Sequence, residues 1–221
     1  MPDSRPAVPA AITDGGVLAI ARHLDPTTVP DVGDALVEGG IRAFELTLNE
    51  PESTALEALA AAARWADGSG IVIGAGTVLS IDAARRAIDA GATFLVAPHL
   101  DAQVVAWAAR SGVPMLPGAA TPTEVLAAWR TGAAAVKVFP ASTLGPAFIR
   151  ELHGPLPDVP LLPTGGVSIE NVAGYIEAGA IAVGIGSWLF GGGSRSSIVE
   201  RAREAVDAVA SARAARAEAG A

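Results

Sequence analysis

Short runs of apolar residues alternate with longer amphipathic segments along nearly the whole chain. Apolar runs of this length are typical of strands that are covered on both faces. Most of the amphipathic segments begin with Ser, Thr or Asp and end with Gly, which is typical of capped helices. The pattern predicts eight strands, over residues 17–22, 43–48, 71–76, 93–98, 114–118, 134–140, 160–165 and 182–187.

The junctions between helix and strand repeat as well. The stretches EGGIRAFEL, DAGATFLVA, RTGAAAVKV and EAGAIAVGI each place a glycine a few residues before an apolar run. Such regularity is typical of successive βα units, in which right-handed crossovers join parallel strands. Eight units in 221 residues predict an α/β fold of the (β/α)8, or TIM, barrel type. A doubly wound open sheet is the alternative, but no GxGxxG motif follows the first predicted strand.

The chain is expected to form a single domain over residues 1–221, because no linker or low-complexity segment interrupts the repeated units. Residues 1–15 are expected to form an N-terminal arm or helix that caps the bottom of the barrel. Residues 195–221 read as a charged C-terminal helix.

Composition narrows the possible functions. The chain has no cysteine, so disulfides, thiolate nucleophiles and cysteine metal sites are excluded. Its net charge of −8 argues against binding to nucleic acid or to an anionic membrane. It lacks a signal-peptide pattern and an apolar run long enough to span a bilayer, so we expect a cytoplasmic protein. A phosphorylated ligand would then have to be held by backbone N–H groups and a few side chains.

Lys137 is the only lysine among fifteen lysine and arginine residues, and it lies inside a predicted strand. Because strand side chains alternate between faces, Lys137 and Phe139 are expected on one face and Val136 and Val138 on the other. The lysine would face the barrel interior if the valines pack beneath the helices. An ammonium group there is costly unless it is paired or neutral.

Two interpretations of Lys137 are open. It could form a structural ion pair with an acid, or it could act as an amine nucleophile that forms a Schiff base with a carbonyl compound. The second is favoured, since arginine makes better ion pairs but cannot become a nucleophile. Glu45 is a second charged residue inside a predicted strand, and it reads either as the proton-transferring group that such chemistry needs or as a counter-ion for Lys137.

Glycines mark a candidate phosphate site. Gly165 and Gly166 end the seventh predicted strand, and Gly186 and Ser187 end the eighth. Backbone N–H groups at these positions can converge on an anion, and phosphate sites in such barrels commonly lie between the seventh and eighth strand loops. The three histidines, in contrast, have no spacing typical of a metal site, and no metal is predicted.

Seven segments in order resemble the ketodeoxyphosphogluconate (KDPG) and 4-hydroxy-2-oxoglutarate (KHG) aldolase family of class I aldolases. They are FELTLNEP, IGAGTVLS, APHLD, LPGAATPTE, AVKVFPAS, PTGGVS and GIGSWL, within residues 12–190. The resemblance implies a Schiff base between Lys137 and the C2 ketone of a phosphorylated 2-keto-3-deoxy sugar acid, with Glu45 as general acid and base. It further implies no metal or organic cofactor, and a homotrimer.

The resemblance also implies roles for other side chains. Thr77 would hold the substrate carboxylate, Arg22 its polar groups and Thr164 its sugar hydroxyls. Asn49 and Phe139 are further substrate-binding candidates, while the phosphate would lie on Gly165, Gly166, Gly186 and Ser187. His23 and His99 occupy loops at the same end, without an assigned role.

The expected reaction is cleavage of 2-keto-3-deoxy-6-phosphogluconate to pyruvate and D-glyceraldehyde 3-phosphate. The C4 epimer, 2-keto-3-deoxy-6-phosphogalactonate, and 4-hydroxy-2-oxoglutarate are alternative substrates, because Asn49 resembles galactonate-type members and Thr164 resembles gluconate-type ones. More distant alternatives are a phosphosugar isomerase or epimerase with Glu45 as its base, and a non-catalytic phosphosugar-binding barrel.

Overall fold

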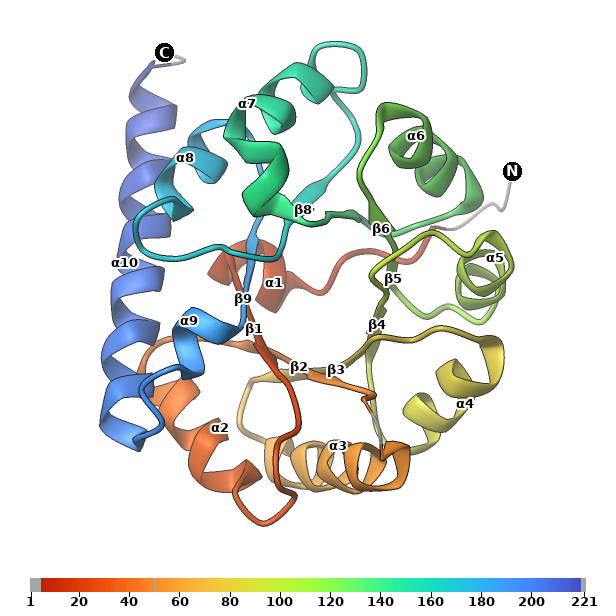
Figure 1. Ribbon diagram of the computed structural model, residues 1–221, viewed down its shortest axis with the longest axis vertical. Coiled ribbons are helices and arrows are strands. Elements are labelled where there is room, and N and C mark those ends of the chain that lie inside the picture. Colours follow the sequence, from red (N-terminus) through yellow and green to blue (C-terminus); the bar gives the residue numbers. More distant parts are fainter. Residues whose placement is uncertain (1–4, 50, 220–221) are drawn as a thin grey trace.

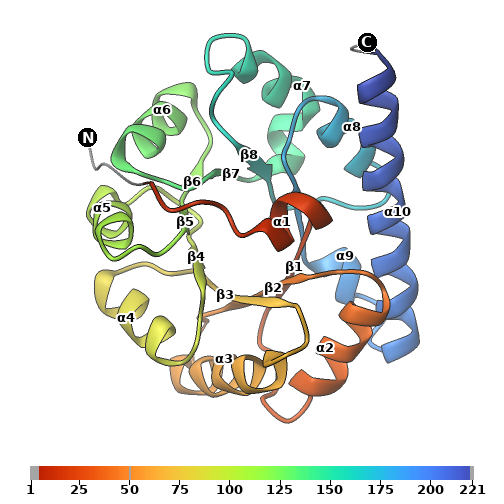
Figure 2. The ribbon, with the colours of Figure 1, turned by 180° about the vertical axis from the view of Figure 1, so that it is seen from behind.

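The computed structural model describes residues 5–49 and 51–219 and is shown from two opposite sides in Figures 1 and 2. Its strands are β1 (Val17–Ala21), β2 (Ala43–Thr47), β3 (Val72–Gly76), β4 (Phe94–Val96), β5 (Met115–Leu116), β6 (Gly118–Ala119), β7 (Val136–Val138), β8 (Leu161–Pro163) and β9 (Val183–Ile185). Each of the eight predicted strand regions therefore contains an observed strand.

Most helices lie between consecutive strands, as the repeated units predict. They are α1 (Ala10–Gly15), α2 (Val29–Glu38), α3 (Glu52–Ala66), α4 (Ile81–Asp89), α5 (Ala102–Arg110), α6 (Pro122–Thr131), α7 (Ala141–His153), α8 (Val172–Glu177), α9 (Ser187–Phe190) and α10 (Arg195–Ala219). None of the described helices is both long enough and apolar enough to cross a membrane. Part of the expected N-terminal arm, residues 1–4, lies outside the described residues.

Local sequence explains where several helices begin. Thr121 caps α6 in a capping box, since its side chain accepts from the N–H of Glu124 and the Glu124 carboxylate accepts from the N–H of Thr121. Ser80 and Asp101 cap α4 and α5 with single side chains. Each of these caps lies two to five residues after the end of a strand.

All strands run parallel, and helices α2 to α8 surround them in both views (Figures 1 and 2). One sheet has the order β5-β4-β3-β2-β1-β9, and a second has the order β6-β7-β8. The α/β class with a curled parallel sheet is therefore confirmed. A single continuous barrel sheet is not, because the hydrogen-bonded ladder is interrupted at two places.

The first interruption lies inside the fifth predicted strand, where only Pro117 separates β5 from β6. Proline has no N–H to donate, so it interrupts the ladder and the chain passes from one sheet to the other. The second interruption lies between β8 and β9, which are joined by one isolated bridge between Thr164 and Gly184.

The buried apolar residues form two separate clusters. The larger part fills the space between the strands and the surrounding helices and includes Val136 and Val138. The smaller part lies among residues at or near the starts of strands, such as Ala43 and Phe94, together with Ile12 of α1. The amino-terminal end of the sheet is thus packed with apolar side chains, which leaves the carboxyl-terminal end for polar groups.

Candidate active site

The candidate residues lie in or directly after strands, at the carboxyl-terminal half of the sheet. Since parallel strands end at the same side, this half is where such folds carry their active sites. The residues that follow strands come after six of the nine described strands, β1, β2, β3, β7, β8 and β9, and are Arg22, Asn49, Thr77, Phe139, Thr164, Gly165, Gly166, Gly186 and Ser187. Lys137 and Glu45 lie within strands β7 and β2.

Lys137 is buried and faces the interior, as the alternation predicts. Its neighbours Val136 and Val138 belong to the core beneath the helices, whereas Lys137 is 3% exposed. Its Nζ lies 5.1 Å from the ring centroid of Phe139, close enough for a cation–π interaction. The amine is therefore shielded from water by strand and aromatic atoms.

Glu45 is also buried, with 1% of its surface exposed. Burial raises the pKa of its carboxyl group above the ordinary value of 4.5, and the positive charges of Lys137 and Arg22 offset only part of that effect. Neither carboxyl oxygen has a hydrogen-bond partner among the described residues. A buried acceptor without a partner is costly, and such groups are concentrated at functional sites.

The electrostatics of Lys137 mirror those of Glu45. Burial lowers the pKa of its ammonium group below 10.5, the charge of Glu45 opposes that effect, and the charge of Arg22 adds to it. A lowered pKa increases the fraction of neutral amine, which is the nucleophilic form.

Lys137 and Glu45 form no direct ion pair. The ion pairs found among the described residues join partly exposed arginines to surface carboxylates, and none includes either residue. The two groups influence each other through space while their polar atoms remain available to a third group. The structure therefore shows no direct contact between Glu45 and Lys137, while the charge of each acts on the pKa of the other, so both interpretations of Glu45 stay open.

Gly76 at the end of β3 is a residue that the sequence analysis did not single out. It pairs with Thr47 in the sheet, and a Cβ atom at this position would overlap the Oε1 atom of Glu45. Glycine therefore allows the carboxyl group to lie against the backbone of the neighbouring strand. The available signal was the glycine itself, because a glycine inside a strand often marks a close approach.

Thr77 follows Gly76 and has an unusual backbone conformation. Its φ angle is 59°, in the left-handed region that β-branched residues rarely adopt. Residues held in this region cluster at active sites and ligand contacts. The strained conformation is an observation independent of the resemblance, and it supports Thr77 as a candidate ligand-contacting residue.

One cavity, of about 530 Å³, brings most of the remaining candidates together. Its lining includes Arg22, Phe139, Thr164, Gly165, Gly166, Gly186 and Ser187. Thr164 is buried, and its hydroxyl oxygen has no hydrogen-bond partner among the described residues. The cavity thus joins the two glycine loops to the aromatic ring that packs beside Lys137.

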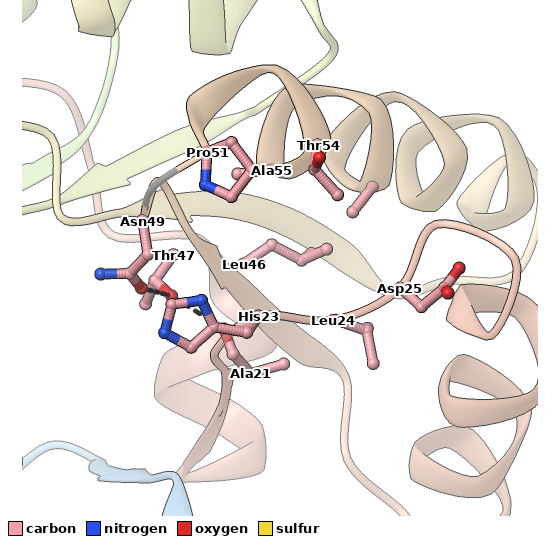
Figure 3. Close-up of a pocket in the computed structure, with 11 residues that line it drawn as sticks. Ala21, His23, Leu24, Asp25, Leu46, Thr47, Asn49, Pro51, Thr54 and Ala55 are labelled. Carbon is pink, nitrogen blue, oxygen red and sulfur yellow. Dashed lines mark hydrogen bonds between the residues drawn. The ribbon is translucent and has the colours of Figure 1, made fainter.

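Asn49 lies apart from this group. It lines an adjacent cavity of about 280 Å³ with His23, Thr47 and Thr54, drawn in Figure 3. The Thr47 hydroxyl contacts both the carbonyl oxygen of Ala21, at 3.1 Å, and the side-chain amide of Asn49. One end of the Asn49 amide is therefore occupied within the protein, and the structure does not bring Asn49 together with Thr164.

The loop after β8 turns its carbonyl groups away from the larger cavity. The carbonyl oxygens of Thr164 and Gly165 accept hydrogen bonds from the N–H groups of Ala141 and Ser142 at the start of α7. In a planar trans peptide the C=O and the next N–H point in opposite directions. The N–H groups of Gly165 and Gly166 therefore point away from α7.

A buried amine of lowered pKa together with a buried carboxyl group of raised pKa is an arrangement suited to Schiff-base chemistry on a ketone. The family model for KDPG and KHG aldolases matches residues 8–209. The chain therefore belongs to this family: it is an aldolase, a carbon–carbon lyase.

Two relatives carry different substrate names. A probable 2-dehydro-3-deoxy-6-phosphogalactonate aldolase of Rhizobium meliloti is 38% identical over 83% of this chain and 85% of its own length. A 2-dehydro-3-deoxy-phosphogluconate aldolase of Pseudomonas aeruginosa is 37% identical over 78% of this chain and 76% of its own length. These identities are too similar to decide between the two C4 epimers.

Two solved structures share the fold. One, described as native KDPGal, has a TM-score of 0.83 and 33% identity, and the match covers 89% of this chain and 95% of that one. The other is the KDPG aldolase of Legionella pneumophila, with pyruvate captured as a covalent carbinolamine intermediate. It has a TM-score of 0.78 and 27% identity, over 88% of this chain and 95% of that one.

Replacing Gly76 with alanine should reduce activity without unfolding the protein. The added Cβ would push the Glu45 carboxyl group away from β3, and displacing a reacting group by about 1 Å can cost roughly 100-fold in rate. We expect kcat for pyruvate release to fall by about that factor while the circular dichroism spectrum stays unchanged. Activity within about twofold of wild type would contradict this account of Gly76.

The raised pKa of Glu45 predicts a pH-dependent difference in stability between wild type and Glu45→Gln. The folded state binds the carboxyl proton more tightly than the unfolded state, so ionisation above pH 4.5 favours unfolding. Wild-type stability should fall relative to the variant as pH rises from 4.5 through the folded-state pKa. Urea unfolding of both proteins across this range measures the difference, and a constant or opposite difference would refute the prediction.

Proposed function

We propose that the chain is a class I aldolase that cleaves 2-keto-3-deoxy-6-phosphogluconate to pyruvate and D-glyceraldehyde 3-phosphate through a Schiff base on Lys137. The observation that carries this proposal is the buried lysine, whose pKa is lowered and whose nearest buried acid, Glu45, makes no direct ion pair with it. The covalent carbinolamine in the Legionella relative supports the same chemistry.

The reaction begins when neutral Nζ of Lys137 attacks the C2 carbonyl carbon and forms a carbinolamine. Protonated Glu45 donates a proton to the carbinolamine hydroxyl, which leaves as water and gives the protonated Schiff base. The Glu45 carboxylate then takes the proton of the C4 hydroxyl, directly or through a water. The C3–C4 bond breaks, its electron pair moves into the Schiff base as an enamine, and the aldehyde is released.

The enamine is next protonated at C3, with Glu45 as the proton source. Water adds to the resulting Schiff base and gives one proton to the Glu45 carboxylate, the carbinolamine hydroxyl proton passes to the nitrogen, and pyruvate leaves as neutral Lys137 and protonated Glu45 are restored. A carboxyl group of raised pKa suits these alternating steps, because it keeps its proton to a higher pH than an ordinary carboxyl group and can still give it up. The reaction involves no net oxidation or reduction, so it requires no redox partner.

The remaining side chains are proposed to bind the substrate. Thr77 would bind the carboxylate, Arg22 the substrate's polar groups and Phe139 the apolar part near Lys137. Thr164 would bind a sugar hydroxyl, which is supported by a buried hydroxyl group that lacks a partner among the described residues. Such a group is costly in the free protein and is satisfied when a ligand supplies the missing hydrogen bond.

The phosphate is proposed to lie on the two glycine loops, Gly165 with Gly166 and Gly186 with Ser187. All four residues line the larger cavity. The outward carbonyls and inward N–H groups of the first loop support anion binding there, with Arg22 as the one cationic side chain in that lining.

The galactonate epimer is the second candidate substrate, and Asn49 is the observation that favours it. Its amide is held by Thr47 in the adjacent cavity, so no cation occupies the place where gluconate-type members carry an arginine. Thr164 favours the gluconate epimer by the same kind of resemblance. Cleavage of 4-hydroxy-2-oxoglutarate also remains compatible with the proposed chemistry.

We further propose that the two sheets act as one (β/α)8 barrel in a single domain. The single residue between β5 and β6 and the bridge between Thr164 and Gly184 support this view. The homotrimer and the cytoplasmic location stay predictions.

Borohydride reduction in the presence of pyruvate tests the proposed intermediate. Reduction of the Schiff base should leave pyruvate covalently attached to Lys137, and peptide mass spectrometry should locate it there. Lys137→Arg is the matched control, because it keeps the positive charge but cannot form the adduct. If wild-type protein gives no adduct, or if Lys137→Arg retains pyruvate release, the class I mechanism is refuted.

A coupled assay of pyruvate release on the two C4 epimers, measured side by side, tests the substrate. We expect the higher kcat/KM with the gluconate epimer, through a hydrogen bond from Thr164, and Thr164→Val should lower this preference about tenfold. A higher kcat/KM with the galactonate epimer would reverse the substrate assignment. If neither epimer yields pyruvate, both substrate assignments are refuted.

A further inference from the structure

Asn171 immediately precedes α8, at a position where asparagine commonly caps a helix. Its side chain makes no cap hydrogen bond to α8. Instead, Oδ1 accepts from the N–H of Ser168 at 3.0 Å, and Nδ2 donates to the carbonyl oxygen of Gly166 at 2.9 Å. Both ends of the amide are therefore turned back onto the loop that follows β8.

This contact completes a series of three held carbonyl groups. The carbonyls of Thr164 and Gly165 accept from the N–H groups of Ala141 and Ser142, at 2.8 and 2.9 Å. The next carbonyl belongs to Gly166, and no backbone N–H of α7 donates to it among the described residues. The side chain of Asn171 donates to it instead. Because peptides are planar and trans, holding this third carbonyl also directs the N–H of Val167.

Without a restraint, the peptide between Gly166 and Val167 would be free to rotate. Gly165 and Gly166 have φ angles of 90° and 75°, and a glycine backbone can rotate through regions closed to other residues. On one side the Cα of Gly166 lies so close to Ser142 that a Cβ there would approach the Ser142 side chain to 2.5 Å. Asn171 holds the other side, so the loop is fixed between two helices.

The same face of α8 holds the start of α7. The hydroxyl group of Tyr175, one helical turn after Asn171, donates to the carbonyl oxygen of Ala141 at 2.8 Å. Tyr175 is buried, so this contact is protected from water. One helix face thus fixes both the loop after β8 and the helix start that binds that loop.

We propose that Asn171 is a positioning residue for the phosphate group of the substrate, because by holding the carbonyl of Gly166 it directs the N–H of Val167, which lines the cavity beside Gly165 and Gly166. The proposal rests on the phosphate site proposed above for this loop. It assigns Asn171 no contact with substrate and no part in the chemistry at Lys137.

The test compares Asn171→Ala and Asn171→Asp with wild type in two binding measurements. The first is the dissociation constant of inorganic phosphate, obtained by calorimetry. The second is the pyruvate concentration that gives half-maximal borohydride trapping on Lys137, which involves no phosphate. We expect phosphate affinity to fall about fivefold to twentyfold in both variants, as for the loss of one or two hydrogen bonds. Half-maximal trapping by pyruvate should change less than twofold.

The aspartate variant separates positioning from helix capping. Aspartate caps helices as well as asparagine does and interacts favourably with a helix N-terminus. A role limited to capping α8 therefore predicts wild-type phosphate affinity for Asn171→Asp. Positioning predicts a loss at least as large as in Asn171→Ala, because a carboxylate cannot donate to the carbonyl oxygen of Gly166. Because the added carboxylate also repels phosphate, the loss must appear in the uncharged Asn171→Ala variant as well.

Thr121→Ala is the matched control, since it removes a side-chain cap from α6. It should lower the melting temperature while phosphate affinity stays within twofold of wild type. Wild-type affinity in Asn171→Asp, an equal loss in Thr121→Ala, or no phosphate binding by wild type would overturn the inference. Absence of the pyruvate adduct in wild type would instead refute the proposed class I mechanism, while the phosphate measurements would still test Asn171.

Discussion

The burial of two opposite charges that do not touch is the constraint on which the site depends. Desolvation moves the pKa of Glu45 up and that of Lys137 down, so both groups shift toward their neutral forms. A direct ion pair would have held both in their charged forms. The absence of a Cβ at Gly76 lets the Glu45 carboxyl group lie against β3.

Much of this arrangement could be predicted from the sequence, because it follows from a short repeat. The twofold alternation of strand side chains placed Lys137 opposite Val136 and Val138, and the structure confirms that orientation. The eight strand regions were likewise predicted from the short apolar runs, and the repeated helix-ending glycines indicated successive βα units. The alternation of strands and helices along the chain was sufficient to predict a parallel sheet, since consecutive βα units allow few other topologies.

The features that could not be predicted depend on contacts between residues distant in the sequence. Pro117 was read as part of one strand, yet it separates two sheets. Asn49 was grouped with the substrate-binding residues, but its amide lies in a separate cavity with Thr47. Asn171 has the sequence signature of a helix cap, and only the observed side-chain direction shows that it holds the preceding loop.

The apolar packing of Ile12 against the strands limits the directions from which ligands can enter the site. With that end of the sheet filled, we expect ligands to reach Lys137 through the larger cavity, whose lining includes the ring of Phe139 beside the amine. Under the proposed reaction, the phosphorylated aldehyde lies toward the entrance and the pyruvate carbons lie on the amine behind it. The aldehyde must then depart first, so the fold itself would impose an ordered release of products.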